Sequence, residues 1–189
     1  MNYQPYIETA SGKRLYFLDP DPDQIDIRDI ALALSRIPRF NGHTTKLLTV
    51  AEHSWAGARY IQQEHKLAFL LHDAAEAYLC DIPSPVKQYI PQYQDIEHGL
   101  QACIEKKFGV DINHQMVKYY DLAMLSNEAW HLVKSQGTDW DVWKQVKRPA
   151  VTAEFRPLCL EPEVAREVFL NLFYELYRDP APVREAKAA

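Results

Sequence analysis

Residues 67–77 read Leu67-Ala68-Phe69-Leu70-Leu71-His72-Asp73-Ala74-Ala75-Glu76-Ala77 and place three ionisable side chains in the most apolar part of the sequence. The spacing of the apolar residues predicts a buried helix over residues 66–79. Burying an imidazole and two carboxylates side by side is unfavourable unless an interaction compensates them. A divalent metal ion is the simplest compensation, so further ligands are expected elsewhere in the sequence.

Two more polar residues stand where the helical pattern calls for apolar ones. His53 lies near the start of a helix predicted over residues 49–64, and Asp121 lies in the apolar stripe of a helix predicted over residues 114–134. Two imidazoles and two carboxylates from three helices suit a divalent transition metal and leave coordination positions open. The candidate ligands are His53, His72, Asp73 and Asp121. The alternative is four separately satisfied core or cap residues.

Two carboxylates near this set are candidates for chemistry. Glu76 follows His72 by four residues, which places both on one face of the predicted helix, so Glu76 can orient or deprotonate an attacking water. Asp81 comes just past the end of that helix. The alternatives are a solvent-facing helical Glu76 and a turn or N-cap role for Asp81 before Pro83.

Basic residues flank the candidate ligands in the sequence and favour an anionic substrate. The segment Arg39-Phe40-Asn41-Gly42-His43 combines a cation, an aromatic ring and amide groups. Arginine can bind two phosphate oxygens at once, and phenylalanine can stack on a base. The alternative is an ordinary surface loop. The other flanking cations are Arg36, Lys46, Lys87 and Lys118.

Composition limits the class of protein. The chain has 189 residues, of which 47% are hydrophobic and 25% charged, and its net charge is −5. These values are typical of one globular domain. The negative charge argues against a partner that is a nucleic-acid polymer, but it is compatible with a small anion in a locally positive pocket.

The location expected for the chain is the cytoplasm, with no membrane partner. Residues 1–5 show no secretory signal, and no apolar run approaches the ~20 residues that span a bilayer. The three cysteines are far apart and odd in number, which is typical of a reduced protein with cysteines as small core residues. They are Cys80, Cys103 and Cys159.

The chain is predicted to fold as a single all-α domain with a short N-terminal β-hairpin. The hairpin spans residues 5–18, with Ser11-Gly12 as its turn, and residues 1–24 form the hairpin and the turn after it. The remaining helices are predicted over residues 26–36, 92–108 and 161–178, with a short one beginning near Pro83. Residues 135–160 are predicted to be irregular and surface-exposed, and residues 180–189 to form a flexible tail.

The order His53, His72-Asp73, Asp121 resembles the HD-domain metal-dependent phosphohydrolases, and within them the small 5′-deoxynucleotidases. The similar segments span roughly residues 26–130 and include Glu76. They are Arg39-Phe40, Ala51-Glu52-His53-Ser54, His72-Asp73-Ala74-Ala75-Glu76, Asp81-Ile82-Pro83-Ser84-Pro85-Val86-Lys87 and Lys118-Tyr119-Tyr120-Asp121.

The resemblance implies a helical HD-domain bundle that binds one divalent transition metal (Co, Mn, Zn, Ni or Fe). It also implies catalytic roles for Glu76 and Asp81 and a catalytic, phosphate-binding role for Arg39. The expected reaction is hydrolysis of the ester between O5′ and the α-phosphorus of a 2′-deoxynucleotide. The expected substrate contacts are Arg39, Phe40, His43, Pro85, Lys87 and Lys118.

The length of the phosphate chain is left open by one departure from the family pattern. Bacterial deoxynucleotidases carry Trp after the arginine, whereas this chain has Phe40. The Arg39–His43 segment together with the hairpin resembles small phage-type members, some of which remove the whole triphosphate from dATP. A monophosphate substrate is favoured, and a triphosphate is the close alternative.

Two other classes of function fit the sequence less well. A nucleotide-binding module without turnover would usually lack a ligand or Glu76, and none is missing here. Cyclic-nucleotide or (p)ppGpp hydrolases of this superfamily usually carry further motifs or domains. A homo-oligomer is compatible with the sequence.

Overall fold

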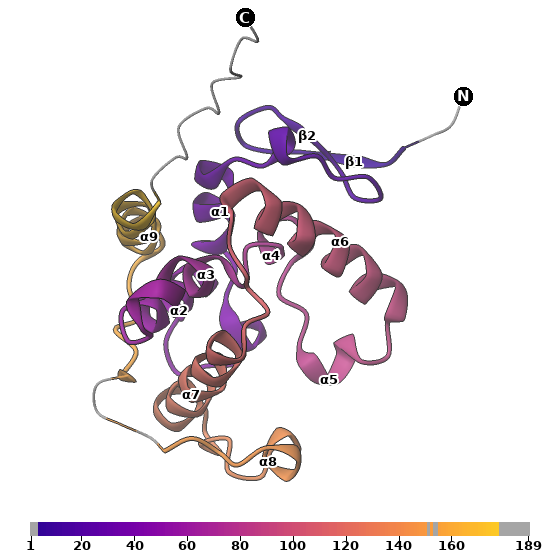
Figure 1. Cartoon of the computed structure of the whole chain (residues 1–189). Coiled ribbons are helices and arrows are strands. Elements are labelled where there is room, and N and C mark those ends of the chain that lie inside the picture. Colours follow the sequence, from indigo (N-terminus) through magenta and orange to yellow (C-terminus); the bar gives the residue numbers. More distant parts are fainter. Residues whose placement is uncertain (1–3, 151, 153–154, 178–189) are drawn as a thin grey trace, which may run out of the picture.

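The computed structural model describes residues 4–150, 152 and 155–177, which form a mostly helical architecture with a short antiparallel hairpin at the N-terminal end (Figure 1). This confirms the predicted fold class. The helices are α1 (Ile27–Leu34), α2 (Val50–Ala58), α3 (Lys66–Leu71), α4 (Glu76–Leu79), α5 (Ser84–Lys87), α6 (Pro91–Phe108), α7 (Gln115–Leu132), α8 (Val142–Gln145) and α9 (Pro162–Leu176), with 3₁₀ turns at Pro22–Gln24, Arg39–Gly42 and Gln63–His65.

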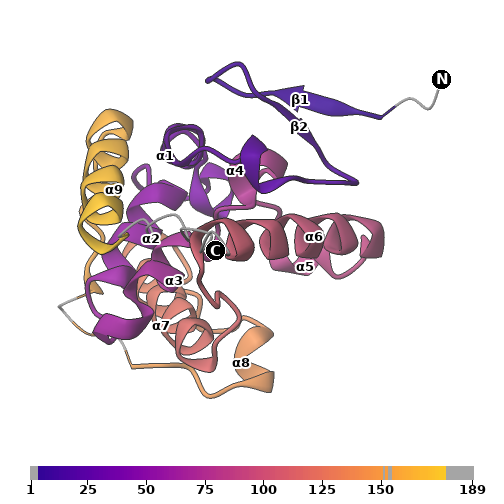
Figure 2. The same cartoon turned by 45° about the horizontal axis from the view of Figure 1, so that its top comes forward.

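The hairpin pairs β1 (Tyr6–Glu8) with β2 (Arg14–Tyr16). Leu15 points into the core and is fully buried. At the turn, the backbone N–H and the hydroxyl of Ser11 donate to the two carboxylate oxygens of Asp29 on α1, at 2.8 and 2.6 Å. These bonds dock the hairpin beside α1, as Figures 1 and 2 both show.

The central helices are α2 and α3, which pack against each other and against α7 and α9 (Figure 2). Their buried faces meet at Phe69, Leu70, Met124 and Phe169. Thr49 caps the start of α2, because its hydroxyl accepts from the backbone N–H of Glu52 at 3.2 Å. It ends at Ala58, six residues earlier than the sequence predicted. The helix packing therefore brings α2, α3 and α7 together around one point of the core.

Gly57 lets α2 approach α3 closely. A Cβ atom at Gly57 would lie within 3.0 Å of two ring carbons of Phe69, which is fully buried. We expect Gly57→Ala to lower the free energy of unfolding by about 1–3 kcal/mol, because the core must shift to accept the methyl group. Denaturant unfolding measures this loss. Gly99→Ala on α6 is the control, since a Cβ there meets nothing within 4 Å, and it should not destabilise the protein.

The prediction of one continuous helix over residues 66–79 is wrong in the middle of that range. α3 ends at Leu71 and α4 begins at Glu76, with a tight turn between them. In a continuous helix the Phe69 carbonyl would accept from the backbone of Asp73. Here it accepts from the backbone N–H of His72 at 3.3 Å and from the His72 ring at 2.6 Å. The polar ring competes with the helical ladder, and the helix breaks there.

The described part of residues 135–160 is largely irregular and mostly exposed or half-buried, as predicted, and Gly137 is the one buried residue among those described. Arg148 donates to the Ser126 hydroxyl at 2.8 Å and to the Gln136 carbonyl at 2.7 Å. Near its end, the Glu52 carboxylate accepts the backbone N–H groups of Leu158, Cys159 and Leu160 at 2.6–2.8 Å. The segment is thus anchored to α7 and α2. The Glu52 side chain therefore does not close a capping box with Thr49, although the spacing of these two residues is typical of one.

The cysteine prediction holds only in part. Cys103 is buried in the core, Cys159 is half-buried and Cys80 is exposed, and all three are free thiols. The prediction is wrong for Cys80, which lies just after the four-residue helix α4 and has a φ of 70°. No helix in the described ranges has the length and apolar character to cross a bilayer. The predicted tail and the end of the helix predicted over residues 161–178 lie outside the described residues.

Candidate metal centre

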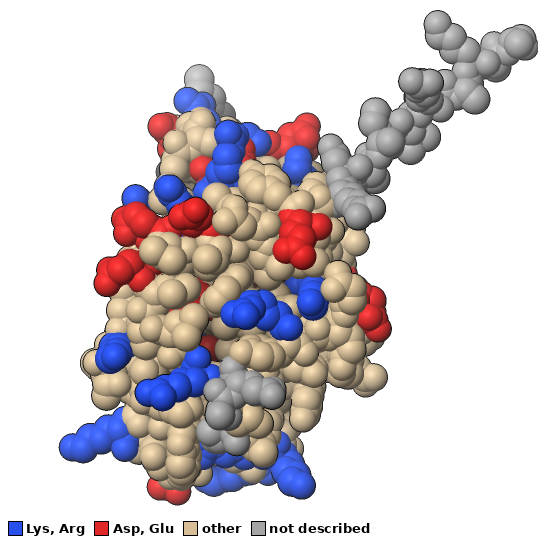
Figure 3. All heavy atoms as spheres, turned by 90° about the vertical axis from the view of Figure 1, so that its left-hand side faces the viewer, with Lys and Arg blue, Asp and Glu red and all other residues tan. Residues whose placement is uncertain are grey.

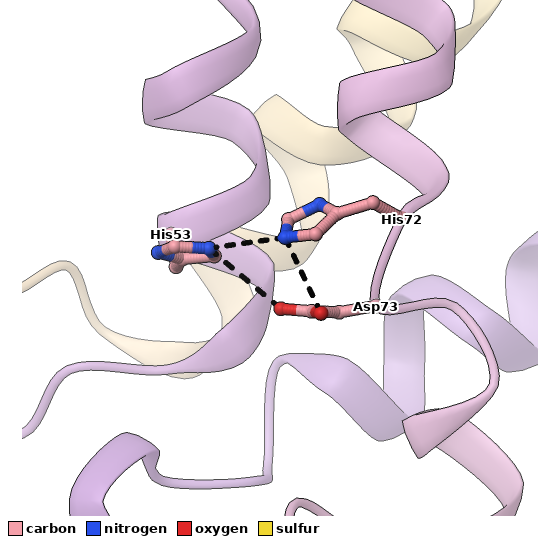
Figure 4. Close-up of side chains that lie close together, drawn as sticks. All are labelled: His53, His72 and Asp73. Atoms are coloured by element: carbon pink, nitrogen blue, oxygen red, sulfur yellow. Dashed lines mark hydrogen bonds and ion pairs between the residues drawn. The ribbon is translucent and has the colours of Figure 1, made fainter. Parts of the chain in front are cut away.

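Three of the four predicted ligands converge where α2 faces the turn between α3 and α4 (Figure 4). The Nε2 atoms of His53 and His72 are 3.3 Å apart. Asp73 completes the group, with Oδ1 at 3.3 Å from His72 Nε2 and Oδ2 at 3.7 Å from His53 Nε2. All three donor atoms lie within 4.8 Å of one another, so this group can hold a metal ion.

Hydrogen bonds on the far side of each ring orient the two histidines. His72 Nδ1 is 2.6 Å from the Phe69 carbonyl, which only accepts, so Nδ1 carries a proton and Nε2 is the nitrogen that offers a lone pair when the ring is neutral. His53 Nδ1 is 2.6 Å from Glu128 Oε1. Such partners are typical of histidines that bind metals. Two Nε2 atoms 3.3 Å apart need a cation or a proton between them, so the residues fit a metal ion.

Asp121 reaches the same point from α7. Its Oδ1 atom is 3.3 Å from His53 Nε2 and 3.7 Å from His72 Nε2. Burial raises the pKa of Asp121, but the two histidines outweigh it and hold that pKa well below its usual value. The four sequence-predicted ligands therefore face one another.

A proton on His53 can supply the positive charge that a metal ion would bring to the neighbouring carboxylates. Burial and the Arg39 guanidinium lower the pKa of His53, but the Glu128 and Asp121 carboxylates outweigh them and raise it to about 9. Protonated His53 would bridge these carboxylates. Because a metal must displace that proton, its binding is expected to weaken as the pH falls.

Glu128 is the residue that the sequence analysis missed. It is fully buried on α7, and its second oxygen accepts from Arg39 Nε at 3.0 Å. Although burial raises the pKa of Glu128, Arg39 and His53 hold it below its usual value. The only signal in the sequence was its position seven residues after Asp121, two helical turns along the same face.

Arg39 lies beside the candidate ligands, as predicted. Its Nη1 atom is 3.5 Å from Asp73 Oδ2, and its side chain is 11% exposed. Since Nε is engaged by Glu128, the terminal nitrogens remain to contact an anion at the metal centre.

Glu76 and Asp81 also lie near Asp73. Glu76 is buried, and its Oε2 atom has no hydrogen-bond partner among the described residues. Burial, and then Asp73 and Asp81, raise the pKa of Glu76 well above its usual value. Burial also raises the pKa of Asp81. Two of the alternative roles are wrong: Glu76 does not face solvent, and the N-cap of α5 is Pro83 rather than Asp81. Glu76 and His72 do not share one continuous helix.

Lys87 lies near the candidate metal centre but forms an ion pair with Glu97. Its Nζ donates to the buried Glu97 of α6 at 2.7 Å. Burial lowers the pKa of Lys87, but Glu97, Glu76 and Asp73 outweigh it and raise the pKa. Lys87 is therefore within electrostatic range of the two carboxylates at the site.

Phe40 stands next to Arg39 with an aromatic partner that the sequence analysis did not single out. The guanidinium carbon of Arg39 is 5.6 Å from the centre of the Phe40 ring, and the Phe40 and Trp140 ring centres are 5.8 Å apart. Phe40 and Asn41 have φ values of 54° and 50°, a strained conformation for such residues that is common near functional sites.

Three residues predicted to bind substrate show no interaction with the candidate metal centre in the described part of the chain. They are exposed on the surface. His43 follows the Arg39–Gly42 turn, Pro85 lies in α5 and Lys118 lies in the first turn of α7.

Comparison with known proteins finds relatives whose names carry no activity. The chain is 38% identical over 172 residues to the uncharacterized protein YfdR of Escherichia coli K12, which covers 90% of this chain and 95% of the relative. It is 42% identical over 110 residues to the uncharacterized protein RCAP_rcc00048 of Rhodobacter capsulatus, 53% of this chain and 56% of the relative. No protein-family profile matches the chain. At this identity and coverage, the chain belongs to the same family as YfdR.

Proposed function

We propose that this protein is an HD-type metal-dependent phosphohydrolase that cleaves the bond between O5′ and the α-phosphorus of 2′-deoxynucleotides. The observation that carries the proposal is the convergence of His53 and His72, with facing Nε2 atoms 3.3 Å apart, on Asp73 and Asp121. The order of these residues in the sequence supports the HD assignment. The favoured substrate is a deoxynucleoside monophosphate, which yields the deoxynucleoside and phosphate.

The residues divide the work around the metal ion. His53, His72, Asp73 and Asp121 would hold it. When bound, such an ion withdraws charge from phosphate oxygens and lowers the pKa of water. Arg39 binds the phosphate through its terminal nitrogens.

Glu76 takes the proton of the attacking water; this role is supported by its buried carboxylate, which has an oxygen without a partner among the described residues and a raised pKa. Water oxygen bonds to phosphorus, the P–O5′ bond breaks and a proton ends on O5′. Asp81 orients the substrate beside Glu76.

The surroundings of Arg39 favour a nucleotide among phosphate esters. Phe40 and Trp140 offer aromatic faces within reach of a base or sugar bound at the same arginine. The triphosphate alternative is supported by Lys87, a further cation in electrostatic range of Glu76 and Asp73. Its pairing with Glu97 keeps the monophosphate ahead.

A small anion is favoured over a nucleic-acid polymer. The face in Figure 3 carries basic and acidic side chains scattered among neutral ones, without a continuous basic strip across the described residues on that face. A polymer would need such a strip to follow its backbone. Arg39 instead lies at the candidate metal centre, 3.5 Å from Asp73, and Lys87 lies within electrostatic range of it.

Hydrolysis in ¹⁸O-labelled water tests the reaction. The protein is incubated with Mn²⁺ or Co²⁺ and a panel of deoxynucleoside mono- and triphosphates, and the products are weighed by mass spectrometry. We expect the label in phosphate from a monophosphate, or in triphosphate from a triphosphate, with unlabelled deoxynucleoside. Pyrophosphate as a product, label in the nucleoside, or binding without turnover would contradict the proposal.

A further inference from the structure

The buried carboxylate of Glu128 serves two different donors at once. Oε1 is 2.6 Å from His53 Nδ1, and Oε2 accepts from Arg39 Nε at 3.0 Å. The Glu128 side chain is 1% exposed, the His53 side chain 0% and the Arg39 side chain 11%, so water does not readily replace either bond. One rigid group therefore touches both a candidate metal ligand and the candidate phosphate-binding cation.

The two bonds have different consequences for the site. The bond to Nδ1 holds the His53 ring so that Nε2 points at His72 and Asp121. The bond to Nε fixes the guanidinium so that Nη1 lies 3.5 Å from Asp73. Partners behind metal-binding histidines set ring orientation and metal affinity, and a held guanidinium loses less entropy when it binds phosphate.

We propose that Glu128 is a positioning residue that sets the geometry of the metal ligand His53 and of the phosphate-binding Arg39 together. The inference rests on the proposed function, since it requires that the site bind both a metal and a phosphate. Each oxygen of Glu128 has its own task, so the residue acts on two binding steps through two separate bonds.

The substitution Glu128→Gln tests the two hydrogen bonds while the size and burial of the side chain stay the same. An amide has one accepting oxygen and one donating nitrogen, so it can accept from His53 or from Arg39 but places its own N–H groups against the other donor. Glu128→Gln thus breaks the paired arrangement without removing volume from the core.

The experiment compares four proteins for two affinities: wild type, Glu128→Gln, Arg39→Gln and the double variant. Cobalt affinity is measured by titrating Co²⁺ against a chelating indicator. Inorganic phosphate affinity is measured by calorimetry at saturating Co²⁺. Glu52→Gln is the matched control, because Glu52 is equally buried and adjacent to His53 but binds backbone N–H groups of Leu158, Cys159 and Leu160.

We expect Glu128→Gln to weaken Co²⁺ binding by about 10-fold or more and phosphate binding by a similar factor. Arg39→Gln should weaken phosphate binding alone. In the double variant, the loss of Arg39 should add little to the phosphate effect, because Arg39 is already misplaced. Glu52→Gln should lower thermal stability and leave both affinities near wild type.

Three results would overturn the inference while the proposed function stands: Glu128→Gln with one of the two affinities unchanged, additive phosphate effects in the double variant, or equal losses in Glu52→Gln. A wild-type protein that binds neither Co²⁺ nor phosphate would overturn the proposed function and this inference with it.

Discussion

Asp73→Ala is expected to abolish metal binding and hydrolysis while the protein remains folded. The carboxylate lies 3.3 Å from His72 Nε2 and 3.7 Å from His53 Nε2, so its removal leaves the two imidazoles without their acidic partner from the same turn. Stability should change little, because Asp73 Oδ2 has no hydrogen-bond partner in the described chain and Arg39 keeps its bond to Glu128. Elemental analysis, the hydrolysis rate and thermal unfolding measure the three quantities.

Asp95→Ala is the control for this substitution, because Asp95 is exposed on α6. It should retain metal, activity and stability. Full metal occupancy in Asp73→Ala would show that the ligands have been assigned wrongly. A hydrolysis rate that excess EDTA leaves unchanged would remove the metal from the mechanism.

Glu76→Gln is expected to lower kcat by about 100-fold or more while the protein still binds metal and substrate, in line with the loss of a general base. Glutamine keeps the size of the side chain but cannot take a proton from water. Burial, and then the charges of the neighbouring Asp73 and Asp81, raise the pKa of this carboxyl group. Replacing it by a neutral group should therefore not destabilise the fold. Steady-state kinetics, metal analysis and denaturant unfolding check these effects.

The control for Glu76→Gln is a substitution at Glu52, a buried glutamate with a different role. Glu52→Gln weakens a contact with backbone N–H groups and should change stability more than kcat. A Glu76→Gln variant with kcat near wild type would show that Glu76 is only a buried helix residue and that another group activates the water.

Local patterns in the sequence predicted most of the longer helices and the candidate ligands. Apolar spacing predicted the helices that became α1, α6, α7 and α9, because burying one face of a helix imposes that spacing. His72 and Asp73 stood out because ionisable groups in an apolar stretch need a compensating partner. The sequence also led to His53 and Asp121, and the structure places all four residues at one point.

The break between α3 and α4 could not be predicted from spacing. The residues on both sides follow a helical pattern, and only the bond from the His72 ring to the Phe69 carbonyl shows why the ladder stops. Similarly, Thr49 and Glu52 have the spacing of a capping box, but the Glu52 carboxylate binds a segment more than a hundred residues away, at Leu158–Leu160.

The sequence by itself determined a helical domain with a hairpin, and a candidate metal-binding set of two histidines and two aspartates. Only the tertiary structure decided which groups orient that set. Glu128 is 75 residues from His53 and 89 from Arg39, yet it binds both. Its neighbours in the chain carry no sign of this role, because a carboxylate becomes buried and paired only when α7 packs against α2. Local chemistry specifies candidates for a site, whereas burial and hydrogen bonding between distant helices select the residues that position them.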